Sequence, residues 1–344
     1  MENTRVCVTG GSSYLGSWLV KSLLEKGYTV HATLRNLGDP SKVGLLKGLV
    51  PNHAHSRLRL FEADIYNPIQ FEPAIQGCKY IFHMATPLQH DPKHIQFKNT
   101  TEAAVSGLMS IVESCIKSGT VKRLIYTASV VAASPIKDSG NGFKPSMDES
   151  CWTPLNHSFS HANEALMAYT HSKTLSEKEV LRHNGKGDLE LEVVSIACGL
   201  VGGDTLLPTI SASLSMGVLI SQVTNNEGWY HTLRFLEELL GKVPIVHIED
   251  VCEAHILCME KPSITGRFLC ASAYLSSAEI ASHWKRCYPY INIAEEFVED
   301  LGREISLGST KLKEIGFEYK FDGKMILDGS LKCAQRLGEV AASQ

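Results

Sequence analysis

Tyr169 and Lys173 are the two side chains whose types and spacing best suit acid catalysis in this chain. Residues four positions apart on a helix project from one face, one turn apart. A phenol is a poor acid near neutral pH, with a reference pKa of about 10, and a nearby ammonium favours its ionised form. The pair could therefore protonate a carbonyl oxygen while a hydride reaches the carbonyl carbon. Because tyrosine and lysine are common on helix surfaces, the spacing becomes informative only together with a cofactor site upstream.

A turn that contains glycine follows the first apolar segment. The sequence predicts a strand over residues 5–10 and an apolar helix from Ser17 onward. A strand, a glycine turn and a helix start form a dinucleotide-binding unit, whose backbone N–H groups face a pyrophosphate. Gly10 and Gly16 match the first and third glycines of the spacing Gly-x-x-Gly-x-x-Gly, and Ser13 replaces the middle one. An isolated glycine pair would indicate only a tight turn, but this position between strand and helix favours a cofactor site.

Arg35 directly follows the second predicted strand, residues 28–34, and lies nineteen positions after Gly16. Folds that select NAD usually carry an acidic residue there for the ribose 2′-hydroxyl, whereas an arginine accommodates the 2′-phosphate of NADP. Lys42 could add a second positive charge. An arginine at a strand end is often a solvated surface residue, yet no acidic residue occupies the position, and the sequence predicts NADP(H) as the cofactor.

Strands and helices alternate along the first part of the chain, as a parallel sheet with crossover helices requires. Beyond about residue 198 the pattern loosens into loops and shorter elements. We therefore expect an α/β fold with a doubly wound parallel sheet (Rossmann) over residues 1–197. A smaller mixed α/β substrate-binding lobe is expected over 198–344, interleaved with the first domain. Further strands are predicted at 58–63, 80–85, 123–128 and 191–197, and helices at 101–118 and 163–183.

Two of these strands end on residues that could contact a dinucleotide. Asp64 follows the third strand, and Met84, Ala85 and Thr86 come at the end of the fourth. The carboxyl ends of parallel strands border the crevice in which such sheets bind the cofactor. These residues are therefore expected at the same edge as the glycine turn.

Composition excludes several other classes of protein. The chain has 344 residues, 44% hydrophobic and 20% charged, which is typical of a cytosolic enzyme. A net charge of −4 gives no electrostatic reason to expect nucleic acid or an anionic membrane as a partner. No apolar run reaches the ~20 residues of a spanning helix, and the first strand begins too early for a signal peptide. Ten cysteines without Cys-x-x-Cys spacing suit a reducing compartment, and fourteen histidines, His53 and His55 among them, show no metal-ligand spacing.

Several further segments carry a family likeness. They are residues 8–11, 27–35, 121–129, 148–152 and 246–251, together with Tyr169-x-x-x-Lys173. These segments resemble plant dihydroflavonol-4-reductase-like proteins, which are extended short-chain dehydrogenases/reductases and include anthocyanidin, vestitone and cinnamoyl-CoA reductases. The likeness covers residues 5–339, and the runs 31–36, 128–135 and 199–205 look closest to the HC-toxin reductase branch.

The resemblance implies a role for each residue of the site. Tyr169 would be the general acid toward the substrate carbonyl, and Lys173 would hold the nicotinamide ribose and lower the pKa of Tyr169. Ser129 would orient the carbonyl and stabilise charge on its oxygen, unless it only satisfies a local backbone group. Cofactor contacts are implied for Gly10, Ser12, Ser13, Tyr14, Leu15, Gly16, Arg35, Lys42, Asp64, Ile65, Met84, Ala85, Thr86, Tyr169, Lys173, Ala197, Gly199 and Leu200. Substrate contacts are implied for Pro87, Val130, Ser134 and Tyr169, and no metal site is implied.

Three residues depart from the family pattern. Ser13 puts a side chain where the backbone approaches the pyrophosphate, and Ala197 replaces a proline that packs near the nicotinamide. Both changes bear on cofactor affinity. Ser134 stands where dihydroflavonol reductases carry an asparagine that contacts the ring hydroxyls, and losing this contact costs discrimination toward polyhydroxylated rings. Apolar residues of the segment 206–230 would form a wall over the nicotinamide or belong to the core of the smaller lobe: Leu207, Ile210, Leu214, Met216, Val218 and Leu219.

The sequence therefore predicts an NADPH-dependent carbonyl reductase for a ketone or aldehyde of a plant phenolic or related secondary metabolite. It would act on this small molecule in the cytoplasm as a monomer or homodimer. Reduction of an anthocyanidin or dihydroflavonol is the alternative within the same class. A second class is a non-catalytic NADP-binding sensor or scaffold, against which retention of Ser129, Tyr169 and Lys173 argues. A third is an epimerase or dehydratase acting on nucleotide sugars, which Arg35 disfavours.

Overall fold

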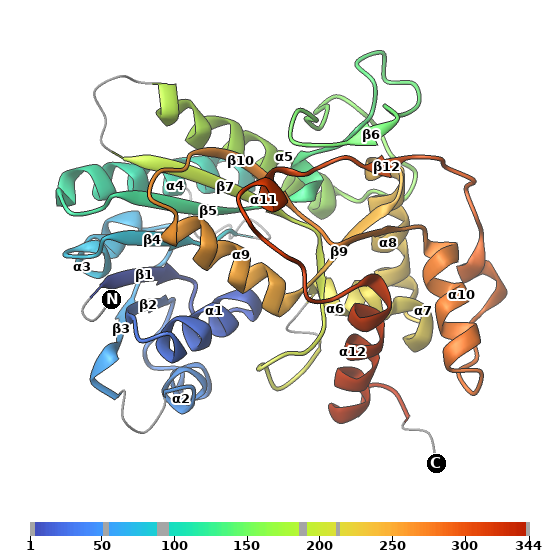
Figure 1. Ribbon diagram of the computed structural model, residues 1–344, viewed down its shortest axis with the longest axis horizontal. Helices are drawn as coiled ribbons and strands as arrows, with labels where there is room; N and C mark the ends of the chain where they lie inside the picture. Colours follow the sequence, from blue (N-terminus) through green and yellow to red (C-terminus); the bar gives the residue numbers. More distant parts are fainter. Residues whose placement is uncertain (1–3, 51–54, 88–95, 186–190, 211–213, 342–344) are drawn as a thin grey trace. The chain divides into compact units, whose positions relative to one another are not determined.

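The computed structural model describes residues 4–50, 55–87, 96–185, 191–210 and 214–341. Among these residues seven strands form one sheet (Figure 1), and the pairs β1–β2, β1–β4, β2–β3 and β4–β5 are parallel. This arrangement confirms the predicted fold class. The strand order is β10 (Gly266–Cys270), β7 (Glu192–Cys198), β5 (Arg123–Ser129), β4 (Tyr80–His83), β1 (Arg5–Thr9), β2 (Thr29–Leu34) and β3 (Leu58–Glu62).

The centre of the sheet contains the point at which the strand order reverses. β1 pairs with β2 on one side and with β4 on the other, so the chain first builds outward to β3 and then returns. Open α/β sheets bind their ligands at such a switch point, beyond the carboxyl ends of the strands. The glycine turn after β1 and residues 84–86 after β4 therefore lie where the sequence predicts a cofactor site.

The inner strands and their helices form because their apolar residues are buried on both faces of the sheet. Residues 6–8 of β1 are fully buried. Helix α1 (Tyr14–Glu25) begins at Ser13, whose side chain caps it, and α4 (Thr100–Ser118) ends at Gly119 with a left-handed φ of 63°. The other helices of this part are α2 (Pro40–Gly48), α3 (Glu72–Ile75), α5 (Glu164–Leu181) and α9 (Ile248–Glu260).

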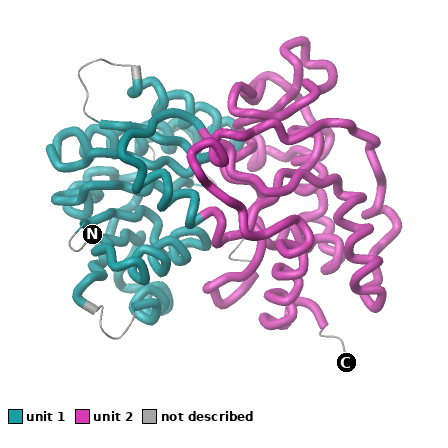
Figure 2. Tube along the Cα trace, in the orientation of Figure 1, with its two compact units in different colours: residues 1–128, 168–196, 252–267 teal, residues 129–167, 197–251, 268–344 magenta. Residues whose placement is uncertain are grey.

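The chain divides into two compact units that alternate along the sequence, as the colours of Figure 2 show. Residues 252–267 belong to unit 1 although they come late in the chain, and residues 129–167 belong to unit 2 although they come early. The candidate acid Tyr169 is thus in unit 1, and Ser129 is in unit 2. Unit 1 comprises residues 1–128, 168–196 and 252–267, and unit 2 comprises 129–167, 197–251 and 268–344.

Unit 2 contains two small sheets. In the first, β9 (Val243–His247) pairs in parallel with β8 (Leu200–Gly202) and antiparallel with β11 (Ala273–Leu275). In the second, β6 (Ser146–Met147) and β12 (Ser306–Leu307) are parallel. This mixture confirms the mixed α/β character predicted for the smaller lobe. The helices of this part are α6 (Leu214–Leu219), α7 (Ser221–Thr224), α8 (Glu227–Leu240), α10 (Ser277–Cys287), α11 (Lys311–Glu314) and α12 (Gly323–Arg336).

The apolar residues between 206 and 230 lie in the interior of unit 2. Ile210, Met216 and Leu219 are fully buried, and Leu207 and Val218 are buried as well. A Cβ on Gly202 would come within 2.5 Å of the Leu219 side chain, so β8 and α6 are tightly packed. These contacts support the interpretation of the segment as core, and the side chain of Leu214 lies outside the described part.

Candidate active site

Helix α5 brings Lys173 against the ends of two strands in unit 1. The Lys173 side chain is buried, and its Nζ donates hydrogen bonds of 2.9 Å to Thr86 Oγ1 and to the Thr127 carbonyl oxygen. Nζ lies 6.0 Å from the centre of the Tyr169 ring, one turn earlier on the same helix. The predicted pair is therefore assembled, with an ammonium held by uncharged oxygens beside a phenol.

His83 and Thr9 form a second buried layer that sequence reasoning missed. Thr9 Oγ1 accepts hydrogen bonds from the N–H groups of Met84 (3.0 Å) and Ala85 (3.1 Å), and it lies 2.9 Å from His83 Nδ1. Because a hydroxyl has two lone pairs and one proton, Thr9 must donate that proton to His83 Nδ1. Burial, together with the charge of Lys173, lowers the pKa of His83 to about 3. The imidazole is therefore neutral and fixes the end of β4, which carries Thr86.

The glycine turn has the tight geometry that a dinucleotide needs. Gly10 has a φ of 68°, and a Cβ on it would lie 3.4 Å from the backbone of Ala85. A Cβ on Gly16 would overlap the Gly10 carbonyl oxygen. The first turn of α1 contains no acidic residue, so its positive dipole end is not opposed by side chains. The turn and helix start thus fit the pyrophosphate of NADP(H).

Ser13 is the N-cap residue of α1, and this role accounts for a serine at this position of the turn. Its hydroxyl accepts a hydrogen bond from Gly16 N at 3.2 Å and so caps α1. A serine is among the preferred residues at such a cap. Among its neighbours, Tyr14 is buried, whereas Ser12 and Leu15 are half-buried.

The charged residues after β2 lie on the surface of unit 1. Arg35 is exposed, and Lys42 at the start of α2 forms an ion pair of 3.6 Å with Asp39. Asp39 also caps α2, and hydrogen bonds from the Ser41 hydroxyl and the Lys42 N–H hold its pKa below its usual value. The two predicted cations are thus both exposed, but Lys42 already has an acidic partner.

The other cofactor candidates of unit 1 lie at strand ends as expected. Asp64 Oδ1 accepts from Tyr66 N at 3.0 Å and shapes the turn after β3, while Ile65 is buried against Gly107 of α4. Met84, Ala85 and Thr86 are half-buried, and Pro87 is buried. The glycine turn, these strand ends, Tyr169 and Lys173 are therefore all assembled on unit 1.

The remaining candidates belong to unit 2. Ser129 ends β5, and its Oγ accepts a hydrogen bond of 3.4 Å from Val131 N, as the local-backbone reading expects. Val130, Ala197, Gly199 and Leu200 are buried. Gly199 lies so close to β9 that a Cβ would come within 2.7 Å of the Pro244 carbonyl oxygen. These residues all belong to unit 2.

Ser134, the predicted substrate contact in place of an asparagine, has backbone partners in this structure. It is fully buried, its Oγ donates to the Leu239 carbonyl oxygen at 2.5 Å, and it accepts from Ile136 N at 3.3 Å. The hydroxyl is thus engaged by the backbone, because α8 ends beside it. Ser134 thus fixes the segment after β5.

Metal-ligand clusters and membrane-spanning helices are both absent from the described residues. Within those ranges, no three or more His, Cys, Asp or Glu side chains gather as metal ligands would. No helix in the same part of the chain is both long and apolar enough to cross a membrane.

The sequence is similar to that of a known enzyme family and of several plant reductases. Residues 6–268 match the model of the NAD dependent epimerase/dehydratase family. A putative anthocyanidin reductase of Ginkgo biloba is 34% identical over 98% of this chain and 96% of its own length. The dihydroflavonol 4-reductase of Callistephus chinensis is 33% identical over 97% of this chain and 87% of its own length.

Solved structures show the same likeness. Vestitone reductase from alfalfa superimposes with a TM-score of 0.77 at 32% identity, over 98% of this chain and 99% of its own. Yeast methylglyoxal/isovaleraldehyde reductase, complexed with NADPH, has a TM-score of 0.75 at 19% identity, over 98% of this chain and 100% of its own, which supports the fold.

Proposed function

This chain belongs to the NAD dependent epimerase/dehydratase family, and from this premise we propose that it is an NADPH-dependent carbonyl reductase. Its substrate would be a ketone or aldehyde of a plant phenolic or related secondary metabolite. The relatives from Ginkgo biloba, Callistephus chinensis and alfalfa support this class, since they are named as anthocyanidin, dihydroflavonol and vestitone reductases. The observation that carries the proposal is the buried Lys173 ammonium, held beside Tyr169 by Thr86 and Thr127.

The predicted cofactor residues would each hold a part of NADP(H). The turn from Gly10 to Gly16, including Ser12, Ser13, Tyr14 and Leu15, would bind the pyrophosphate at the N-terminus of α1. Arg35 and Lys42 would bind the 2′-phosphate, for which Lys42 would exchange its Asp39 partner. Asp64, Ile65, Met84, Ala85 and Thr86 would line the adenosine and ribose portions, and Ala197, Gly199 and Leu200 the nicotinamide.

The chain's own side chains would manage the proton. When bound, NADPH supplies the hydride. Tyr169 would protonate the carbonyl oxygen of the substrate, and the Lys173 ammonium would stabilise the phenolate that remains. Ser129 would donate a hydrogen bond to the same oxygen, while Pro87 and Val130 would contact the substrate's apolar part. The capture of Ser134 by the backbone supports a substrate with few ring hydroxyls.

A panel of substrates tests this proposal. NADPH consumption should give a higher kcat/KM for hydrophobic aryl ketones and aldehydes than for dihydroquercetin. If dihydroquercetin or an anthocyanidin is clearly the best substrate, the alternative is correct and the enzyme is a flavonoid reductase. If NADPH binds tightly but no member of the panel is reduced, the sensor or scaffold function is favoured.

We also propose that the protein works in the cytoplasm as a monomer or homodimer, without nucleic acid or membrane partners. Among the described residues no disulfide links any of the ten cysteines, and nine of the ten are buried, which suits a reducing compartment. Residues 198–344 would supply most of the substrate lobe. Light scattering of the purified protein would decide between monomer and dimer.

A further inference from the structure

Glu177 is a buried carboxylate on α5 that the proposed reaction does not use. Its exposed fraction is 0%, and that of its partner Arg267 is 5%. Arg267 Nε donates to Oε1 and Arg267 Nη2 donates to Oε2, each at 3.0 Å, so the ion pair is bidentate. Ser195 Oγ also donates to Oε1, at 2.5 Å. The carboxylate thus ties α5 to β10 through Arg267 and to β7 through Ser195.

The position of Glu177 on the helix connects this ion pair to the candidate acid. Tyr169, Lys173 and Glu177 follow one another at intervals of four residues, so they lie in successive turns along one side of α5. Lys173 is the middle member and has a phenol on one side and a carboxylate on the other. A carboxylate without a partner at this point would attract the ammonium in competition with Tyr169.

The groups packed against this side of the helix respond to the same charges. Tyr126 of β5 is buried, and its ring centre lies 5.2 Å from Lys173 Nζ. Burial, then Glu177, then Tyr169 raise the pKa of Tyr126. His83 of β4 stacks on Tyr126 with ring centres 5.9 Å apart and stays neutral. Among the described residues, the titratable or charged groups that these contacts place against this side of α5 are Tyr126, His83 and the cation Arg267.

We propose that the Glu177–Arg267 pair is a positioning device for the candidate acid: it fixes the rotation of α5 and neutralises Glu177, so that the Lys173 charge acts on Tyr169. This inference rests on the proposed role of Tyr169. Buried ion pairs can also be purely structural. The two roles differ in a measurable way, because only the electrostatic role makes the ionisation of Tyr169 depend on the sign of the charge left behind.

The test is a pH titration of tyrosinate absorbance in the full-length protein without cofactor. Each variant is compared with the same variant carrying Tyr169→Phe, so that the difference spectrum isolates the Tyr169 phenol. Arg267→Gln leaves the Glu177 anion unpaired and should raise the pKa of Tyr169 by about one unit, a tenfold change in its ionisation constant. Glu177→Gln leaves the Arg267 cation and should lower it. The double variant Glu177→Gln/Arg267→Gln should return the pKa toward the wild-type value, and Arg267→Lys should preserve it.

Opposite shifts in the two single variants, cancelled in the double variant, support the proposal. Equal shifts in all three, or no shift in any, overturn it and leave a structural ion pair. If Arg267→Gln does not fold, Glu177→Gln compared with the double variant decides the question by the same criterion. The titration does not depend on turnover, so it can succeed or fail separately from the substrate panel that tests the proposed function.

Discussion

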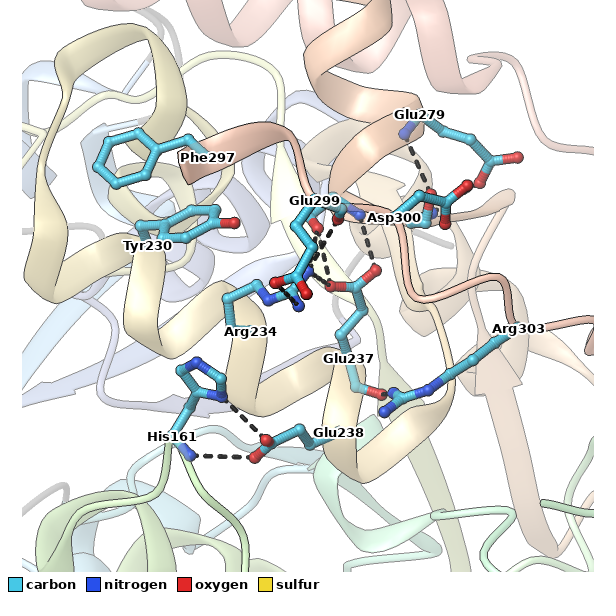
Figure 3. A network of polar contacts seen from close by, with 12 residues as sticks. His161, Tyr230, Arg234, Glu237, Glu238, Glu279, Phe297, Glu299, Asp300 and Arg303 are labelled. Atoms are coloured by element: carbon cyan, nitrogen blue, oxygen red, sulfur yellow. Dashed lines mark hydrogen bonds and ion pairs between the residues drawn. The ribbon is translucent and has the colours of Figure 1, made fainter. Parts of the chain in front are cut away.

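Helices α5 and α8 each bury a cation, and they differ in what holds it. On α8, Arg234 donates to Glu237 Oε2, to Ser277 Oγ and to Glu299, and Glu237 in turn accepts from the backbone and side chain of Ser277 (Figure 3). On α5, Lys173 is held by the uncharged oxygens of Thr86 and Thr127.

The type of partner distinguishes a cation that stabilises the fold from a cation that can act on a neighbouring catalytic group. Buried groups of opposite charge that pair with each other can hold two elements together. Arg234 and Glu237 form such a pair, and Glu237 also accepts a hydrogen bond from the start of α10. A buried cation held by neutral oxygens next to a phenol keeps a strong electrostatic effect on that phenol. We therefore interpret the cluster on α5 as chemical and the network on α8 as structural, and the following predictions test that contrast.

The largest effect is expected at Lys173. Lys173→Ala should lower kcat about a thousandfold, because the phenol loses the charge that stabilises its ionised form. It should also weaken NADPH binding, since the same ammonium is proposed to hold the ribose. Steady-state kinetics and a nucleotide titration measure both effects. A variant with wild-type kcat would show that the buried ammonium is structural, as on α8.

Glu237→Gln in unit 2 should act on stability instead. Removing the carboxylate leaves Arg234 buried with an incomplete set of partners, which should cost about 3 kcal/mol of unfolding free energy. The kcat of the folded fraction should not change. Urea denaturation followed by fluorescence measures the loss, and Arg182→Gln, which breaks an exposed ion pair, is a control expected to cost about 0.5 kcal/mol. A fall in kcat of Glu237→Gln without a fall in its unfolding free energy would contradict the interpretation of the α8 network as structural.

The stability of unit 1 should depend on pH through His83. Its folded pKa of about 3 lies below the ordinary value of 6.5, so the unfolded chain takes up the proton first as pH falls. The stabilisation is complete above pH 6.5 and is lost progressively toward pH 3, by about 2 kcal/mol at pH 5. Unfolding curves at several pH values should show a weaker pH dependence for His83→Asn, which keeps a hydrogen-bonding group near the Nδ1 position. An unchanged slope would mean that His83 does not stay neutral.

The smallest effect concerns the choice of cofactor. NADPH should bind wild-type protein at least about tenfold more tightly than NADH, a difference of about 1.4 kcal/mol, and Arg35→Ala should remove most of it. Lys42→Ala should matter less, since Asp39 already neutralises part of the Lys42 charge. Equal affinities of the wild type for both nucleotides would overturn the NADP assignment.

Local sequence patterns predicted the fold and the half of the site that depends on them. The alternation of apolar strands and helices, the glycine turn and the four-residue spacing of Tyr169 and Lys173 are all short-range signals, and each element forms within a residue or a few of its predicted bounds. Comparison with the family pattern identified Ser13 only as a replacement for a glycine. Its role as the cap of α1 became visible in the local geometry of the turn.

The parts that were missed depend on residues far apart in the sequence. Thr9 and His83 are separated by 74 positions, and Glu177 and Arg267 by 90, so no spacing rule connects them. The signal available for Thr9, His83 and Arg267 was a polar residue in a largely apolar strand. Glu177 lies on a helix with many other polar residues and gave no such signal. The hydrogen bond of Ser134 was unforeseen for the same reason, since its partner, the Leu239 carbonyl oxygen, lies 105 positions away.

The most direct test of the account is Tyr169→Phe, which removes the phenolic oxygen and its proton and leaves the ring. NADPH affinity should stay within about twofold of the wild type, while kcat on the best substrate of the panel should fall about a thousandfold, because the carbonyl oxygen has lost its acid. Nucleotide titration and steady-state kinetics on the same protein sample give both numbers. Wild-type kcat in Tyr169→Phe would contradict the account and transfer the acid role to another group.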